Sequence, residues 1–243
     1  NAISPDLTVP KVKPAKTDPS FGPAGIDSFS ISTVDQKVMW VGTSNGLVKM
    51  SRDKGKTWDD VSIPNLPNKT IMNIFSIEAS HHDAGTAYVA TEDHFLLDYK
   101  PHVYRTKDFG KTWIEIVNGL PEDHPAGSWT HVIREDPVRA GLLFCGTESG
   151  VYVSFDDGDH WQSLALDMPT TSVRDLKIKG NDLVAATYGR GFFILDDYAP
   201  LREVTPATLS EAAHIYKPST AIRVRRSVNG ATPFPPEVPT AKN

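Results

Sequence analysis

The sequence contains a single cysteine, Cys145, which lies in the apolar run 142–145, so no disulfide can form within the chain. Free cysteines are often buried, and no neighbouring residue would activate this thiol, so we expect Cys145 to be a small buried side chain. No apolar run approaches the roughly 18 residues that a membrane-spanning helix requires. The net charge of −5 argues against general binding to nucleic acid or acidic membranes, which requires a basic surface.

Three segments share the pattern Ser/Thr-x-Asp-x-Gly-x-x-Trp and begin at residues 51, 106 and 154. The fixed positions are Ser51, Asp53, Gly55 and Trp58, then Thr106, Asp108, Gly110 and Trp113, and finally Ser154, Asp156, Gly158 and Trp161. Each copy follows strand-like segments bounded by turn residues, and a short strand-like segment comes after its Trp. Four short strands in a unit of about 40–55 residues are typical of a β-propeller blade.

A fourth unit begins at Val173, but it reads Asp196-Asp197-Tyr198 where the motif is expected. We therefore predict an all-β fold over residues 26–198, with about three and a half four-stranded blades of a larger propeller. Residues 1–25 are rich in proline and predict an extended connection, with 1–8 as the end of a preceding blade. Residues 199–243 predict a Pro-rich extension or linker.

Known propellers have about four to eight blades, and an open one leaves strand edges exposed. The expected partners are therefore the remaining blades of the same parent protein, or a second copy of the chain. The motif itself predicts a hairpin turn, in which the hydroxyl and the Asp bond local amides and the Gly adopts a conformation that a Cβ would disfavour. Asp53, Asp108 and Asp156 are thus expected to be structural. Residues 156–159 lack the EF-hand pattern, so neither a metal nor a cofactor is predicted.

The three motifs resemble the Asp-boxes, or BNR repeats, of sialidases, sortilin-type receptors and xyloglucan-cleaving glycosidases. Residues 134–137, 151–158 and 186–192 are similar to recurring segments of large bacterial propeller proteins described as sortilin-like or as BNR-repeat glycosyl hydrolases. The resemblance covers residues 3–203. It implies that the Asp-box turns lie on the rim away from the ligand site, and we expect a secreted or periplasmic protein.

Ligands of propellers usually bind at the opposite face, around the central channel, where the loops between the second and third strands of each blade and the loops from one blade to the next project. This placement predicts ligand contacts from Glu148, Tyr188, Arg190, Asp93, His94 and Trp129. Asp93 and His94 belong to the insertion 92–102, which is either a structural loop, a recognition element, or a site for metal binding or acid–base chemistry. Arg190 either binds a carboxylate or phosphate or forms a salt bridge with a neighbouring blade.

Two classes of function follow. The first is a binding or scaffold module for a protein, peptide or glycan, and it is favoured because the Asp-boxes are structural. The alternative is a glycoside hydrolase of the sialidase or xyloglucanase type. A sialidase needs three arginines and a Tyr–Glu pair, but only Arg190 is placed on the channel face. A glycosidase needs two carboxylates about 5–10 Å apart, for which Asp93 and Glu148 are candidates.

Overall fold

The computed structural model describes residues 4–9, 24–64, 66 and 72–218, and its strands form four separate antiparallel sheets. The first sheet contains β1 (Ile26–Ile31), β2 (Met39–Thr43), β3 (Val48–Ser51) and β4 (Asp59–Asp60), and the second contains β5 (Asn73–Ala79), β6 (Ala87–Asp93), β7 (Asp98–Thr106) and β8 (Ile114–Glu115). The third contains β9 (Thr130–Glu135), β10 (Leu143–Thr147), β11 (Val151–Ser154) and β12 (Gln162–Ser163), and the fourth contains β13 (Val173–Lys179), β14 (Asp182–Thr187) and β15 (Phe192–Leu195).

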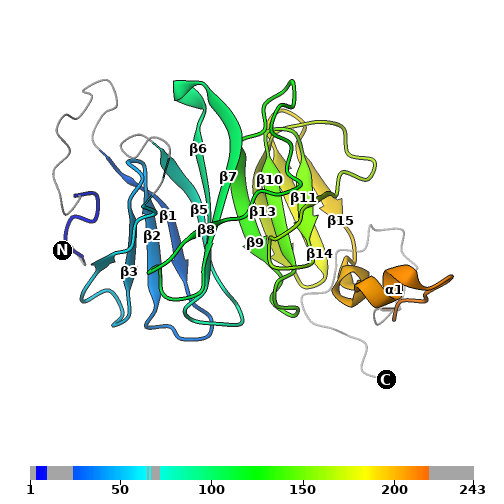
Figure 1. Ribbon diagram of the computed structural model, residues 1–243, viewed down its shortest axis with the longest axis horizontal. Coiled ribbons are helices and arrows are strands. Elements are labelled where there is room, and N and C mark those ends of the chain that lie inside the picture. Colours follow the sequence, from blue (N-terminus) through cyan, green and yellow to red (C-terminus); the bar gives the residue numbers. More distant parts are fainter. Residues whose placement is uncertain (1–3, 10–23, 65, 67–71, 219–243) are drawn as a thin grey trace, which may run out of the picture.

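The four sheets follow one another across the molecule in chain order (Figure 1). Neighbouring sheets meet along their first strands, because β1 contacts β5, β5 contacts β9, and β9 contacts β13. Within each sheet the strands then follow in sequence order away from this inner line. Four-stranded antiparallel sheets arranged in this way are propeller blades. The chain is therefore a partial β-propeller, as the repeat predicts.

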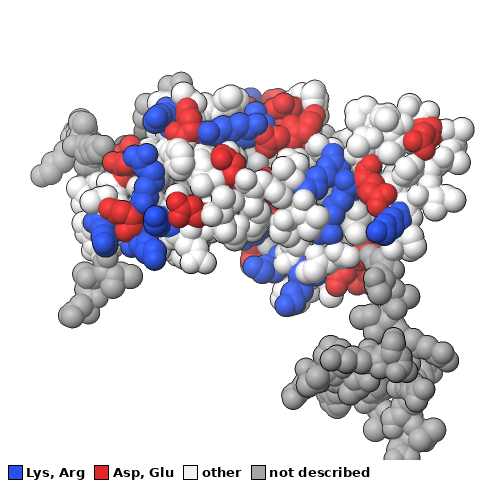
Figure 2. Space-filling model, turned by 90° about the horizontal axis from the view of Figure 1, so that it is seen from below, with Lys and Arg blue, Asp and Glu red and all other residues white. Residues whose placement is uncertain are grey.

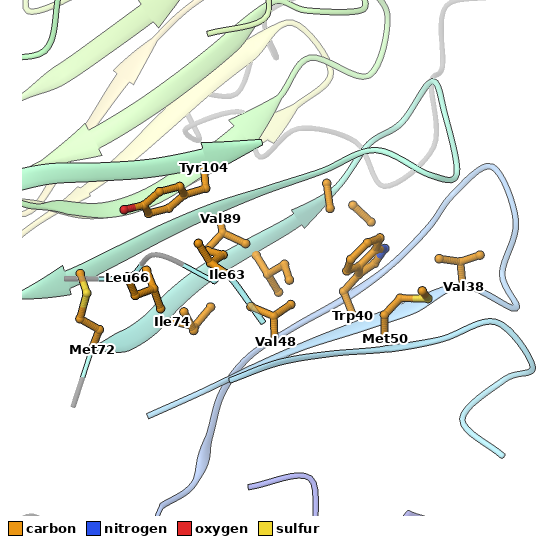
Figure 3. Packing of buried hydrophobic residues seen from close by; sticks show 13 residues of the cluster. Val38, Trp40, Val48, Met50, Ile63, Leu66, Met72, Ile74, Val89 and Tyr104 are labelled. Carbon is orange, nitrogen blue, oxygen red and sulfur yellow. The ribbon is translucent and has the colours of Figure 1, made fainter. Parts of the chain in front are cut away.

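Apolar side chains fill the space between successive sheets. Figure 3 shows this packing between the first and second sheets, where Trp40 and Met50 of the first face the region of Ile74 and Val89 of the second. Each of these four side chains is almost fully buried. Burial of one large apolar side chain stabilises a fold by about 1.5–3 kcal/mol. The blades are thus held mainly by sheet-on-sheet packing, since the single cysteine, Cys145, is buried and unpaired.

The three repeated turns, at residues 51–58, 106–113 and 154–161, have the same hydrogen-bond network. In the first, Ser51 Oγ accepts a hydrogen bond from Gly55 N at 2.8 Å, and Asp53 Oδ1 accepts one from Thr57 N at 2.8 Å. The corresponding distances are 3.0 and 2.9 Å in the second turn and 2.8 and 2.9 Å in the third. The glycine has a positive φ in all three turns. The three turns therefore share one local hydrogen-bond geometry.

The repeated turns also join one sheet to the next. Trp113 Nε1 donates to Val61 O of the first sheet's last segment at 2.8 Å, and Trp161 Nε1 donates to Ile116 O of the second's at 2.8 Å. Trp58 instead donates to Gly55 O within its own turn, at 3.0 Å. The second and third tryptophans thus hold corresponding positions against the preceding sheet, whereas Trp58 bonds within its own turn.

The fourth sheet has a different ending. Asp196, Asp197 and Tyr198 stand where the repeated motif is expected, and the Tyr198 hydroxyl donates to Asp136 Oδ2 at 2.6 Å. Arg202 Nε reaches the same oxygen at 2.9 Å, so Asp136 holds the 3₁₀ helix η2 (Ala199–Glu203) against the third sheet. The helix α1 (Pro206–Ser210) follows. Residues 199–210, expected to lie in a linker, are therefore helical and partly docked, while 219–243 lie outside the described residues.

Most of the proline-rich connection expected at residues 1–25 also lies outside the described residues. Within the described stretch 4–9, Leu7 is buried, and Asn45 Nδ2 donates to Thr8 O at 2.9 Å. These residues therefore pack against the hairpin between β2 and β3.

The surface seen from below carries acidic and basic side chains beside one another, with uncharged residues between them (Figure 2). The ion pairs at the surface include Arg52 with Asp59 at 3.6 Å, both exposed, and Lys107 with the half-buried Asp157 at 2.6 Å. Exposed pairs of this kind contribute at most about 1 kcal/mol each. This face therefore presents no extended field of one sign. Within the described part of the chain, no helix is both long and apolar enough to cross a bilayer.

Candidate functional site

Each sheet contains a register irregularity near the start of its first strand. The pairing shifts between Ile26 and Ser28, between Asn73 and Ser76, across from Thr130, and between Val173 and Asp175. Such bulges redirect side chains and are common beside binding sites. The side chains set apart by these shifts include Asp27, Phe75, His131 and Arg174, and all four line one groove of about 730 Å³ along the inner strands.

Arg134 ties the middle of this groove together. Its Nη1 donates to Ser76 Oγ on β5 at 3.0 Å, and its Nε donates to the Leu176 carbonyl on β13 at 2.9 Å. Its Nη2 pairs with Asp175 Oδ1 at 2.8 Å. One guanidinium thus joins the inner strands of three sheets, and the groove floor is held in a fixed shape.

At one end of the groove, Glu148 accepts three polar contacts at a single oxygen. Oε2 accepts a hydrogen bond from Ser172 Oγ at 2.7 Å, and His131 Nε2 lies 2.8 Å from the same atom. Arg174 Nη2 is 3.4 Å away. The guanidinium of Arg174 also lies over the ring of Tyr188, 5.2 Å from its centroid. Glu148 therefore orients the histidine and arginine that face the groove.

Behind His131 lies a second carboxylate, that of Glu92 on β6. Its side chain is only 1% exposed, and neither oxygen has a hydrogen-bond partner among the described residues. The nearest basic atoms are His94 Nδ1 at 3.2 Å and His131 Nδ1 at 3.6 Å. Burial raises the pKa of Glu92 to about 7, because a charged carboxylate loses its hydration there. Burial also lowers the pKa of both His131 and His94.

An aromatic cluster adjoins these groups. The Trp129 ring stacks on His94 with centroids 5.2 Å apart and lies 5.5 Å from the ring of Tyr99. Trp129 and Tyr99 line a separate pocket of about 510 Å³, between the tip of the β6–β7 hairpin and the segment 121–129. This pocket shares no lining residue with the groove. In the described residues, no group of three or more His, Cys, Asp or Glu side chains could hold a metal ion.

The insertion 92–102 is not a long loop, because its residues continue the β6–β7 hairpin. β6 extends to Asp93, the 3₁₀ helix η1 spans His94–Leu96, and β7 resumes at Asp98. The turn is completed by Leu97, whose φ is +65°. Asp93 is opposite Asp98 in the ladder and its side chain is buried. Strand pairing satisfies the backbone here, which explains why eleven residues form so little irregular structure.

The predicted ligand residues fall into two groups. Glu148, His94 and Trp129 lie in or beside the polar cluster, and Tyr188 is exposed next to Arg174. Arg190 is exposed and has no hydrogen bond or ion pair among the described residues, so the predicted salt bridge with a neighbouring blade is not found there. Asp93 is buried in the hairpin.

His131, Ser172 and Arg174 were not predicted from the sequence, because His131 and Arg174 belong to inner strands and Ser172 directly precedes one. Two of them, His131 and Arg174, occupy equivalent positions in the repeat, so a comparison of the units would have identified them. Ser28 is opposite Gly42, Val132 opposite Gly146, and Asp175 opposite Ala186, and the residues just before them are Asp27, His131 and Arg174. Alignment of the four units on these small residues would therefore have pointed to the groove.

No family model matches the sequence. A stretch of 62 residues is 29% identical to the vacuolar protein sorting/targeting protein 10 of Kluyveromyces lactis, covering 26% of this chain and 4% of that protein. The chain therefore spans a small part of this curated relative.

Several solved structures have a similar fold. YCF48 bound to a D1 peptide gives a TM-score of 0.52 at 20% identity, over 71% of this chain and 51% of that one. The GH74 enzyme of Niastella koreensis gives 0.52 at 13% identity, over 67% and 26%. The β-propeller domain of Swd1 from Myceliophteria thermophila gives 0.51 at 13% identity, over 70% and 51%. The chain thus spans about half of YCF48 and Swd1 and about a quarter of the GH74 enzyme, and these likenesses establish its fold as that of a β-propeller.

Proposed function

We propose that this chain is part of a secreted or periplasmic Asp-box β-propeller and acts as a binding or scaffold module for a protein, peptide or glycan. The observation that carries this proposal is the bulge in each of the four sheets, which directs Asp27, Phe75, His131 and Arg174 into one groove. Four separate strands with the same irregularity supply an apolar ring and both signs of charge along a single surface. One of the similar solved structures, YCF48, has a D1 peptide bound.

The repeated turns support the Asp-box assignment. All three have the same hydroxyl-to-glycine and aspartate-to-backbone hydrogen bonds. Their aspartates bond groups of their own turn. In the third turn, for example, Asp156 contacts Ser154 and His160. The turns therefore build the blades, and this leaves ligand binding to the groove.

The alternative function is glycoside hydrolysis, and the GH74 likeness gives it a fold in common with known glycosidases. A glycosidase requires one carboxyl group as acid and a second as nucleophile or base, both in reach of the sugar. Here the Glu92 and Asp93 side chains are buried, and Glu148 is engaged by Ser172, His131 and Arg174. This geometry favours binding over hydrolysis.

The test is a binding screen of the 243-residue chain against peptide and polysaccharide panels, followed by substitutions at both faces. We expect Arg174→Ala to weaken the strongest hit about tenfold, with a nearly unchanged melting temperature, because the residue lies in the groove and is partly exposed. Asp108→Ala should instead lower the melting temperature and leave the affinity nearly unchanged, since it removes bonds to Thr112 and Thr106 within a turn. Loss of binding in an Asp108→Ala protein that melts like the wild type would contradict the proposal.

Glu148→Gln separates the two functions, because it preserves the shape of the side chain and removes the charge that a nucleophile or general acid needs. A glycosidase that uses Glu148 would lose turnover by orders of magnitude and still bind its polysaccharide. A binding module would release no reducing sugar before or after the change. Measurement of reducing ends across the polysaccharide panel therefore decides between the two classes.

A further inference from the structure

The pocket beside the β6–β7 hairpin has a chemistry of its own, outside the groove. Its lining residues are Leu97, Asp98, Tyr99, Lys100, Glu122, Asp123, His124, Pro125, Ala126, Gly127 and Trp129. Two aromatic rings and three carboxylates are set against one lysine. We name it the hairpin pocket.

The two sides of the hairpin pocket are joined by the backbone. Ser128 N donates to Tyr99 O at 3.0 Å, which links the segment 121–129 to β7. The Ser128 hydroxyl in turn accepts a hydrogen bond from His124 N at 3.2 Å. These bonds fix the width of the pocket before any ligand arrives, and such preorganisation lowers the entropic cost of binding.

The aromatic wall is also fixed. Gly127 has a φ of +96°, and a Cβ built there would lie 1.9 Å from Trp129 Cζ3, so only glycine lets the indole pack against this backbone. The indole also stacks on the ring of His94 and lies beside the ring of Tyr99. Tyr99 remains 46% exposed, and its neighbours Phe95 and Leu97 are more exposed still. An exposed apolar cluster with a polar rim is typical of a binding surface.

The rim of the pocket is acidic. Glu122 and Asp123 are exposed, and Asp98 lies at the start of β7. Among the described lining residues, Lys100 opposes them: its Nζ lies 3.7 Å from Glu122 Oε2, with both side chains more than half exposed. An exposed pair at this distance is weak, so an incoming cation can replace the lysine. Aromatic faces beside carboxylates attract guanidinium groups through cation–π and ionic interactions.

We propose that the hairpin pocket binds the guanidinium group of an arginine side chain presented by a protein partner. Tyr99 and Trp129 provide the aromatic faces, and Glu122 and Asp123 provide the countercharge. Lys100 occupies the acidic rim in the free protein and moves aside on binding. The proposal does not depend on the groove, because the two surfaces share no lining residue.

The test uses two peptides, acetyl-Gly-Arg-Gly-amide and its citrulline counterpart, which has the same shape but no charge. The reporter is the Trp129 indole N–H resonance, assigned by Trp129→Phe, in a titration of the whole chain. We expect a saturable shift with the arginine peptide, and binding of the citrulline peptide at least tenfold weaker. No shift with the arginine peptide at about 20 mM, or equal affinities for the two peptides, would overturn the proposal.

Variants locate the site. The double change Glu122→Gln with Asp123→Asn should lower the affinity for the arginine peptide at least fivefold. Lys100→Gln should raise this affinity about two- to threefold, because the lysine no longer competes for the carboxylates. The matched control is Glu211→Gln with Asp59→Asn, which makes the same change in charge at exposed positions elsewhere and should leave the affinity unchanged. An equal effect of both double variants would show that net charge alone attracts the peptide, and would overturn the assignment to this pocket.

Discussion

Glu92 has a carboxylate enclosed by protein, with His94 and His131 as its nearest basic neighbours. Its pKa of about 7 lies above the value of 4.5 for an ordinary glutamate. Between these two pH values the folded chain keeps the proton and the unfolded chain releases it. The contribution of Glu92 to the free energy of unfolding is therefore fully present below about pH 4.5. It decreases as the pH rises towards 7, by about 3 kcal/mol in total.

Glu92→Gln should remove this pH dependence, because glutamine resembles the protonated acid and does not titrate. We expect the variant to be about 3 kcal/mol more stable than the wild type at pH 8 and nearly equal to it at pH 4.5. The depressed pKa values of His94 and His131 destabilise both proteins at low pH, so they largely cancel in the comparison. Urea unfolding at the two pH values measures the effect. A difference that stays constant with pH would refute it.

Single residues differed in how far the sequence could place them. The residues of the three repeated turns were predictable because their bonds are local, as between Asp53 and Thr57, four positions apart. Glu92 was predictable as part of an insertion, but its burial was not, because it depends on His131 from another sheet. The role of Arg174 was equally hidden, since it arises from a bulge and from Glu148 in the β10–β11 turn of the neighbouring sheet.

At the scale of elements, the second and third sheets each contact the preceding one through the glycine of their repeated turn. A Cβ at Gly110 would lie 2.6 Å from Val61 Cβ, and one at Gly158 would lie 2.4 Å from Ile116 Cδ1. The first turn has no such neighbour, because a Cβ at Gly55 would come no closer than 3.5 Å to any described atom. The same motif therefore meets different constraints in different sheets.

Gly110→Ala and Gly55→Ala form a matched pair. Both glycines have a positive φ, at +76° and +82°, so both variants carry a similar backbone cost. Gly110→Ala also forces the first and second sheets apart at Val61, and we expect it to cost about 1–3 kcal/mol more. Thermal or urea unfolding of both variants tests this. Equal destabilisation would show that the turns do not set the spacing between sheets.

The repeat made most elements predictable, since alternating strands bounded by turn residues recur in each unit. Two segments differed from the prediction for separate reasons. The insertion 92–102 contains a proline and several charges, which suggested a loop, but cross-strand pairing absorbed it into the β6–β7 hairpin. Residues 199–210 suggested a linker, but buried bonds from Asp136 to Tyr198 and Arg202 hold η2 in place, and these partners lie more than 60 positions away.

At the scale of the whole molecule, apolar surface is exposed at both ends of the row of sheets. Phe29 and Ile31 are exposed on β1, and Phe192 and Ile194 are exposed on β15, at 75% and 59% for the latter pair. β15 forms one edge of a sheet that has three strands among the described residues. Unpaired edges of this kind attract further strands.

We predict that the isolated chain associates, either with another segment of its parent protein or with a second copy. Phe192→Lys with Ile194→Lys should shift the chain towards monomer, because charged edge residues prevent strand pairing. Val138→Lys with Leu166→Lys is the control, since it alters two exposed apolar residues outside the strands. Light scattering reports the mass of each. A wild-type chain that stays monomeric and melts cooperatively would refute the prediction.

The contacts of η2 have a mechanical consequence. Arg139 Nη1 donates to the carbonyls of Leu201 and Val204, at 2.9 and 2.8 Å, and Arg202 pairs with the buried Asp136. Both anchors belong to the loop between β9 and β10, not to the fourth sheet. A pulling force applied beyond Val204 therefore passes into the third sheet and bypasses β15. β15, on which Phe192 and Ile194 are exposed, is thereby relieved of that load.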